Sequence, residues 1–175
     1  MTMIHIHSDA TRSSLTEVQD KDVQPNAVDL RLGKVFKIED TAFIIDEEQK
    51  VHRGSKEMTV DDEGYYNLDP GHYEVIMENE INVAYGEAGF VITRSTLNRN
   101  GVHLTSGLYD SGYGIDAKTG EKVGGVMAGV MHVTCGTMHI KPGTRIGQFL
   151  LFESETLGMY DGSYGNHKKH DKKYR

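Results

Sequence analysis

Cationic and hydroxyl side chains gather in one polar segment, residues 92–113, ITRSTLNRNGVHLTSGLYDSGY. Its first part carries Arg94, Ser95, Thr96 and Arg99, side chains that donate hydrogen bonds to phosphate oxygens. Its second part carries Asp110 in a turn with glycine close by, where a carboxylate could activate a water molecule. The segment therefore predicts a site at which a phosphorylated substrate is bound and hydrolysed.

Each half of this segment has a simpler structural interpretation when it is taken alone. The stretch around Arg94 could be a capped turn with an ion pair, and one helical turn over residues 95–98 is expected. Asp110 could accept hydrogen bonds from the backbone of its own turn. Evidence from the other segments of the sequence is needed to choose between these interpretations.

Composition restricts the class of protein. The chain has 175 residues, of which 37% are hydrophobic and 26% charged, and its net charge is -7. These values predict a soluble globular domain and disfavour nucleic-acid binding, which requires a basic surface. We find no apolar run that could cross a membrane and no secretion signal. The only cysteine, Cys135, excludes an internal disulfide and a multi-cysteine zinc site, and favours a reducing, cytoplasmic setting.

The pattern of apolar residues predicts an all-β fold. Twenty glycines and frequent turn signals leave little room for long amphipathic helices. A strand with Asp29 and Arg31 on one face is expected after Pro25, and an exposed hairpin or loop over residues 46–64. The other expected strands span residues 35–38, 41–45, 73–77, 81–83, 89–92, 101–104, 123–133, 138–140 and 148–152.

Two pairs of residues have the spacing of metal sites or ion pairs. His5 and His7 could share a metal ion on one face of a strand, but a plain surface strand or a disordered leader is the preferred interpretation. Asp29 and Arg31 are interpreted as a structural ion pair at a turn or a subunit contact.

Six segments in order carry a resemblance to a known family: QPNAVDLRLG, NLDPGHYEVIMENEINV, RSTLNRNG, HLTSGLYDSGYG, IKPGTRIGQFLLFE and HDKKYR. Together they resemble the dCTP deaminase/dUTPase superfamily from residue 23 onwards. The resemblance implies a distorted β jelly roll of the β-clip type, assembled as a homotrimer with nucleotide sites at subunit contacts. It divides the chain into a leader (1–22), a β domain (23–158) and a flexible tail (159–175).

The resemblance also assigns roles to single residues. Asp110 matches the family's water-activating aspartate and Tyr113 the aromatic residue that packs on the deoxyribose. Mg²⁺ is carried mainly by the triphosphate, with Asp29 a further contact through water, and Arg145 serves a turn or a trimer contact. The phosphate groups are matched by Arg94, Ser95, Thr96, Arg99 and Gln148.

The tail resembles the closing segments of both branches of the superfamily. Tyr164 matches an aromatic residue that covers the base, and Lys173 matches a lysine that reaches the phosphates. A solubilising basic end is the alternative interpretation of the lysines.

The glutamate that the deaminase branch uses as a proton shuttle is absent. Gly129 stands near its position, and no Asp or Glu occurs between Glu121 and Glu153. Asp116 and Glu121 belong to an insertion, residues 115–124, which leaves the base preference open. His132 and Cys135 are interpreted as a hydrogen-bonded core histidine and an inert core cysteine.

These observations favour a Mg²⁺-dependent diphosphatase that converts a deoxypyrimidine triphosphate, with dUTP the preferred candidate, to the monophosphate and pyrophosphate. A dCTP deaminase, or a bifunctional deaminase and diphosphatase, is one alternative hypothesis. A catalytically inactive nucleotide-binding regulatory protein is another.

Overall fold

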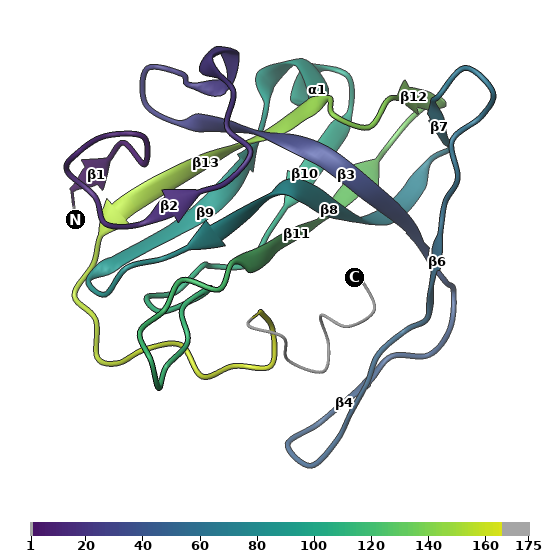
Figure 1. The fold of residues 1–175 in the computed structure, drawn as a ribbon. Helices are drawn as coiled ribbons and strands as arrows, with labels where there is room; N and C mark the ends of the chain where they lie inside the picture. Colours follow the sequence, from purple (N-terminus) through teal and green to yellow (C-terminus); the bar gives the residue numbers. More distant parts are fainter. Residues whose placement is uncertain (1, 166–175) are drawn as a thin grey trace.

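A curled antiparallel sheet forms most of the computed structural model, which describes residues 2–165 (Figure 1). Nine strands join in one sheet, with the order β1-β13-β3-β8-β11-β10 and with β2, β6 and β9 paired to β8, β3 and β13. The main strands are β3 Val28–Ile38, β8 Gly71–Asn82, β9 Glu87–Thr93, β10 Val102–Thr105, β11 Gly125–Val133 and β13 Arg145–Glu153. The all-β prediction is confirmed.

Short elements complete the chain. They are β1 Met3–Ile4, β2 Ser14–Leu15, β4 Ile44–Ile45, β5 Lys50–Val51, β6 Ser55–Glu57, β7 Tyr66–Leu68, β12 Met138–Ile140, the 3₁₀ turn η1 Asp20–Asp22 and the helix α1 Ser95–Arg99. The two strands expected at 73–77 and 81–83 are one strand, β8. The expected helical turn is α1. In the described part of the chain, no helix is long and apolar enough to cross a membrane.

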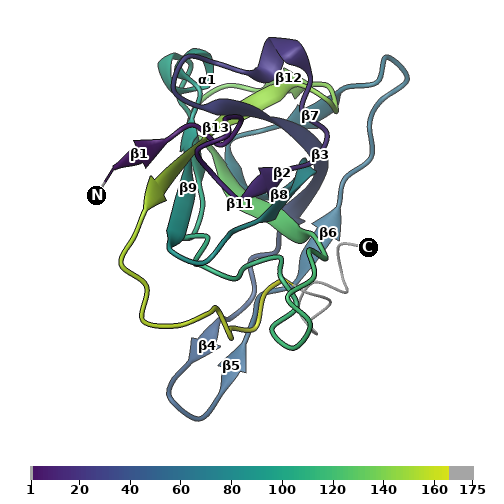
Figure 2. The same cartoon turned by 60° about the vertical axis from the view of Figure 1, so that its left-hand side comes forward.

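Strand β3 connects the two halves of the curled sheet (Figure 2). Its first part pairs with β13 and its second part with β8, and the register of the β8 pairing shifts between Leu32 and Lys34. Gly33 lies at this irregularity, where an added Cβ would be 3.0 Å from the Ile76 carbonyl oxygen. The bend lets one strand serve both halves, as bulges commonly do.

The core lies between the two halves of the curled sheet. Alternation along the strands places one set of side chains inside, because successive residues of a strand point to opposite faces. In β9, Gly89 and Val91 are buried while Phe90 and Ile92 are exposed. Fully buried members of the core include Leu30, Leu32, Tyr73, Met127, Met131, Ile146 and Phe149.

The N-terminal segment is paired with this sheet. Strand β1 pairs with β13 and β2 with β8. Asp22, at the end of η1, is buried and accepts a 2.9 Å hydrogen bond from the Arg31 Nε. Burial alone would raise the pKa of Asp22, but hydrogen bonds from Arg31 and the Gln19 N–H outweigh burial and lower this pKa. Arg31 therefore pairs with Asp22, and Asp29 takes other partners, so the expected Asp29–Arg31 pair is wrong.

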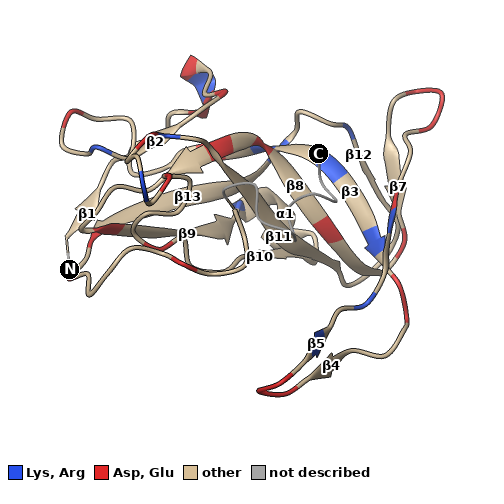
Figure 3. Cartoon of the chain, turned by 60° about the horizontal axis from the view of Figure 1, so that its bottom comes forward, with Lys and Arg blue, Asp and Glu red and all other residues tan. Residues whose placement is uncertain are grey.

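A two-stranded arm, β4–β5, projects from the body of the molecule (Figure 2). Acidic residues 46–48 lie at its tip (Figure 3), and Ile44, Ile45 and Val51 on its strands are exposed. The expectation of an exposed hairpin within residues 46–64 agrees with this arm. The chain returns from the arm through β6, which pairs with β3.

Candidate active site

The predicted phosphate-binding residues lie where β9 ends and α1 begins. Arg94 is the residue before the helix, and its N–H donates to the Ile146 carbonyl oxygen at 3.2 Å. Leu97 is buried and anchors α1 to the body. The side chains of Ser95, Thr96 and Arg99 consequently face solvent, where they are accessible to an anion.

Asp29 joins three chain segments at this end of the sheet. It is fully buried in β3, and its Oδ2 lies 3.3 Å from Arg94 Nε and 3.2 Å from an Arg145 guanidinium nitrogen. Its Oδ1 accepts a 3.1 Å hydrogen bond from Gln148 Nε2. We call Asp29, Arg94, Arg145 and Gln148 the Asp29 cluster. Two guanidinium groups and one carboxylate leave the cluster with a net positive charge, which favours phosphate.

The Asp29 cluster contains two residues predicted to bind phosphate and one that sequence reasoning assigned elsewhere. Arg94 and Gln148 are brought together, as the predicted site requires. Arg145 had been assigned to a turn or a trimer contact, and the structure places it on Asp29 instead. A spacing of three would place Arg145 and Gln148 on opposite faces of a regular strand. The register of the β13–β3 pairing shifts between Arg145 and Gly147, and no sequence signal showed this irregularity.

Asp29 does not fit as a direct magnesium ligand. Both of its carboxylate oxygens accept hydrogen bonds or ion pairs from side chains of the cluster, and the side chain has no exposed surface. Among the described residues, no group of three or more His, Cys, Asp or Glu side chains is arranged to hold a metal ion. A magnesium ion at this site would therefore depend on ligands from the substrate.

Replacing Asp29 by Asn should lower the free energy of unfolding by about 2–3 kcal/mol, because two partly buried guanidinium groups lose their counter-charge. Urea denaturation at matched protein concentration measures this change. Asp116→Asn is the control, since Asp116 Oδ1 accepts only local bonds, from Lys118 N–H, Thr119 N–H and the Thr119 hydroxyl. Equal stability of the Asp29 and Asp116 variants would contradict a structural role for the cluster.

Asp110 lies at the other end of β9, in a turn that two glycines permit. Tyr109 forms a bridge with Gly89, and the Tyr113 N–H donates to the Asp110 carbonyl oxygen at 3.0 Å. Gly112 has φ +89°, a conformation that favours glycine. No described residue donates a hydrogen bond to the half-exposed Asp110 carboxylate, which leaves it available to a water molecule. The interpretation of Asp110 as a turn-stabilising side chain is therefore wrong.

Tyr113 is buried beside this turn. Its hydroxyl donates to the Val126 carbonyl oxygen at 2.7 Å, and its ring meets Tyr109 and Tyr160 edge to face. Gly165 lies against the ring, where an added Cβ would be 2.6 Å from a ring carbon. The C-terminal segment thus covers the Tyr113 ring in this structure.

One chain does not bring its phosphate-binding residues to its own Asp110. Tyr109 pairs with Gly89, five residues before Arg94 on β9, and a strand advances about 3.3 Å per residue. The two groups are consequently separated by roughly 16 Å along the strand. The two predicted halves of the site therefore lie at opposite ends of β9 within one chain.

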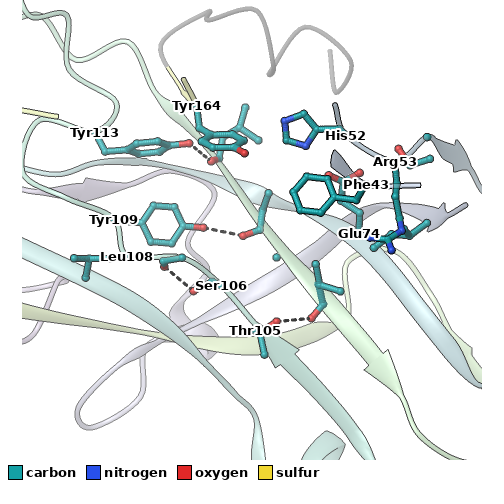
Figure 4. A pocket seen from close by; sticks show the side chains of 18 of the residues that line it. Phe43, His52, Arg53, Glu74, Thr105, Ser106, Leu108, Tyr109, Tyr113 and Tyr164 are labelled. Atoms are coloured by element: carbon teal, nitrogen blue, oxygen red, sulfur yellow. Dashed lines mark hydrogen bonds between the residues drawn. The ribbon is translucent and has the colours of Figure 1, made fainter. Parts of the chain in front are cut away.

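A pocket of about 600 Å³ opens beside Tyr113 (Figure 4). Tyr109, Tyr113 and Tyr164 line one side of it. Residues that flank the β4–β5 arm line the opposite side: Phe43 precedes β4, and His52 and Arg53 follow β5. The Arg53 guanidinium carbon lies 5.9 Å from the centroid of the Phe43 ring.

Sequence reasoning missed the arm side of this pocket. Residues 46–64 are polar and have no periodic pattern, so no signal showed that the chain would turn back towards Tyr164. The inserted residues Asp116 and Glu121 do not line the pocket. Lys173 lies outside the described residues.

Gly129, which stands near the position of the deaminase glutamate, lies where β10 and β11 approach closely. An added Cβ would be 2.6 Å from the Thr105 carbonyl oxygen and 3.1 Å from the Leu104 side chain. No real Cβ is found at the shorter of these distances, so a larger residue would require the backbone to shift. The site holds no acid at this position and, in this backbone, has no room for one.

The remaining candidate residues, His5, Cys135 and His132, lie outside the two ends of the site. His5 bonds the Gln24 carbonyl oxygen through Nε2 and accepts from the His7 N–H through Nδ1, so neither nitrogen is available to a shared metal. Cys135 is exposed, so its expected core position is wrong. It follows the last residues of β11 into a turn. His132 is half-buried and bonds His72 and Thr105 on the outer face of the sheet, so its expected hydrogen bonding is confirmed and its expected core position is wrong.

Comparisons with known proteins identify the family of this chain. The family model for dCTP deaminase-like proteins matches residues 2–154. A probable deoxyuridine 5'-triphosphate nucleotidohydrolase of Halobacterium salinarum is 30% identical over 158 residues, covering 88% of this chain and 88% of that protein. A protein of the same name from Methanococcoides burtonii is 30% identical over 151 residues, covering 84% and 83% of the two chains.

A solved structure shares the fold. The 2'-deoxycytidine 5'-triphosphate deaminase from Agrobacterium tumefaciens superimposes with a TM-score of 0.57 at 14% sequence identity. The match covers 78% of this chain and 43% of that chain. The curled sheet is therefore common to both proteins.

Proposed function

Because the chain belongs to the dCTP deaminase-like family, we propose that it hydrolyses dUTP to dUMP and pyrophosphate in the presence of Mg²⁺. The relatives that are 30% identical over most of both chains are named as nucleotidohydrolases of this substrate. The observation that carries the proposal is the Asp110 carboxylate beside the Tyr113 pocket, which has no hydrogen-bond donor among residues 2–165. In the same site, Gly129 stands where deamination needs an acid.

The proposed reaction is a displacement at the α-phosphorus. Asp110 accepts a proton from a water molecule as the water oxygen attacks, and the bond from the α-phosphorus to the bridging oxygen breaks. Pyrophosphate leaves with the electron pair of that bond. The nucleoside occupies the pocket, with its deoxyribose on Tyr113 and its base under Tyr164.

Binding of the phosphates is assigned to the other end of the sheet. The exposed Ser95, Thr96 and Arg99 supply hydrogen-bond donors, and the Asp29 cluster holds Arg94 and Gln148 in place. Lys173 is proposed to reach the same phosphates. Magnesium enters with the triphosphate and offsets its negative charge, without Asp29 as a direct ligand.

The separation of these two ends supports a site shared between chains. We propose a homotrimer in which the phosphate-binding residues of one copy face Asp110 of its neighbour. Such an arrangement is consistent with the closed symmetry of most homo-oligomers. The single cysteine, which is exposed, supports a reducing, cytoplasmic setting for this enzyme.

A screen of the common deoxynucleoside triphosphates with Mg²⁺ tests the function. We expect dUTP to yield dUMP and pyrophosphate, and dCTP to yield no ammonia. Pyrophosphate release and the nucleoside product are both measured, the second by chromatography. Ammonia from dCTP would favour a deaminase, and tight dUTP binding without pyrophosphate release would favour a regulatory protein.

A further inference from the structure

Three histidines form a row across the sheet, outside the residues assigned to hydrolysis. His103 on β10 is opposite His132 on β11, and His132 is opposite His72 on β8. Residues directly opposite each other on antiparallel strands point to the same face. Their neighbours Leu104, Met131 and Tyr73 are buried, so this histidine row lies on the outer face.

Two nitrogens of the histidine row already meet. The Nδ1 atoms of His72 and His132 are 2.9 Å apart, and the two rings are at 71° with centroids 5.0 Å apart. Nε2 of His132 lies 3.1 Å from the Thr105 hydroxyl, which donates its own proton to the Val130 carbonyl oxygen. While Thr105 keeps its bond to Val130, its oxygen is the acceptor for a proton on Nε2 of His132, and in that tautomer the Nδ1 lone pair of His132 is directed towards His72.

This arrangement has the features of a histidine metal ligand. Ligating imidazoles commonly donate their second N–H to an oxygen, which fixes the tautomer and the ring orientation. Thr105 supplies that oxygen for His132.

We propose that His72 and His132 bind a divalent transition-metal ion, Cu²⁺ or Ni²⁺, through their two Nδ1 atoms. Two nitrogens at about 2.0–2.1 Å from an ion are about 2.9 Å apart when the angle between them is 90°, and about 3.3–3.4 Å apart at the tetrahedral angle. The observed separation fits neighbouring positions in square-planar or octahedral coordination, which Cu²⁺ and Ni²⁺ adopt.

Binding requires His72 to carry its proton on Nε2, so that both Nδ1 lone pairs face the ion. The described residues contain no preformed group of three ligands, so these two nitrogens form the site and water completes the coordination. This ion is separate from the magnesium that accompanies the triphosphate.

Calorimetric titration of the metal-free full chain with CuCl₂ and with NiCl₂ tests the proposal. The chain has nine histidines, so weaker background sites are expected and the tightest site is compared. We expect His72→Ala to weaken that site at least tenfold, since one of two ligands is lost. His72 is exposed, so the substitution leaves the core intact.

His139→Ala is the matched control, because His139 is an exposed histidine of β12 whose Nδ1 bonds Asn67. It should bind metal as the wild type does. Electron paramagnetic resonance of the Cu²⁺ form should show coupling to two imidazole nitrogens, and to fewer in the His72 variant. Unchanged affinity in His72→Ala, or an equal loss in His139→Ala, would overturn the site.

Discussion

Replacing Asp110 by Asn is expected to lower kcat for dUTP about 10³-fold, because an amide cannot accept the proton of the attacking water. The affinity for the nucleotide should change by less than about threefold, since the substitution is isosteric and the phosphate-binding residues lie elsewhere. Steady-state pyrophosphate release gives kcat, and calorimetry with a non-hydrolysable dUTP analogue gives the affinity.

Asp116→Asn is the control, because it removes one negative charge near the turn without removing the proposed general base. Asp116 lies on the hairpin that follows the Asp110 turn, outside the residues that line the pocket. Its kcat should equal that of the wild type. Full turnover by the Asp110 variant would refute the proposed mechanism and leave the binding assignment intact.

Two inactive variants are expected to restore activity when they assemble together. Arg99→Ala removes an exposed cation of the phosphate side, and Asp110→Asn removes the base. In a trimer that contains both variants, one of the three shared sites takes Arg99 from one chain and Asp110 from its neighbour and is intact, so about a third of the wild-type activity should return. Co-expression with two affinity tags isolates the mixed assemblies for the assay.

Each variant assembled only with itself is the control for this experiment. If both halves of the site belonged to one chain, the mixed assemblies would stay at the level of the controls. That outcome would require the 16 Å separation along β9, estimated from about 3.3 Å per residue, to be closed by a change of shape within a single chain.

The local pattern of apolar and polar residues was sufficient to predict much of the fold and to nominate candidate residues for the two ends of the site. Alternating apolar residues gave most main strands, and Arg94 and Asp110 lie in contiguous polar motifs. The Asp29 cluster could not be predicted in the same way, because it depends on the register of β3 against β13, which places Gln148 opposite Asp29. Such pairings between distant segments cannot be predicted from the residues of either segment alone.

The β4–β5 arm and Cys135 are two further features whose positions could not be predicted from the sequence. Phe43, His52 and Arg53 reach the pocket through the path of an aperiodic polar segment, which propensities do not determine. Cys135 was expected in the core because cysteine is often buried. It lies instead in the turn after β11, where a local break in the strand decides its exposure.

The close approach at Gly129 has a consequence for how this chain could change during evolution. A glutamate there would place its Cβ 2.6 Å from the Thr105 carbonyl oxygen. A single substitution would therefore damage the strand pairing before it could supply a proton shuttle. Deamination would become reachable only after other changes had first moved β10 away from β11, and those changes would bring no catalytic gain of their own. The glycine thus separates the two activities of the superfamily by several mutational steps.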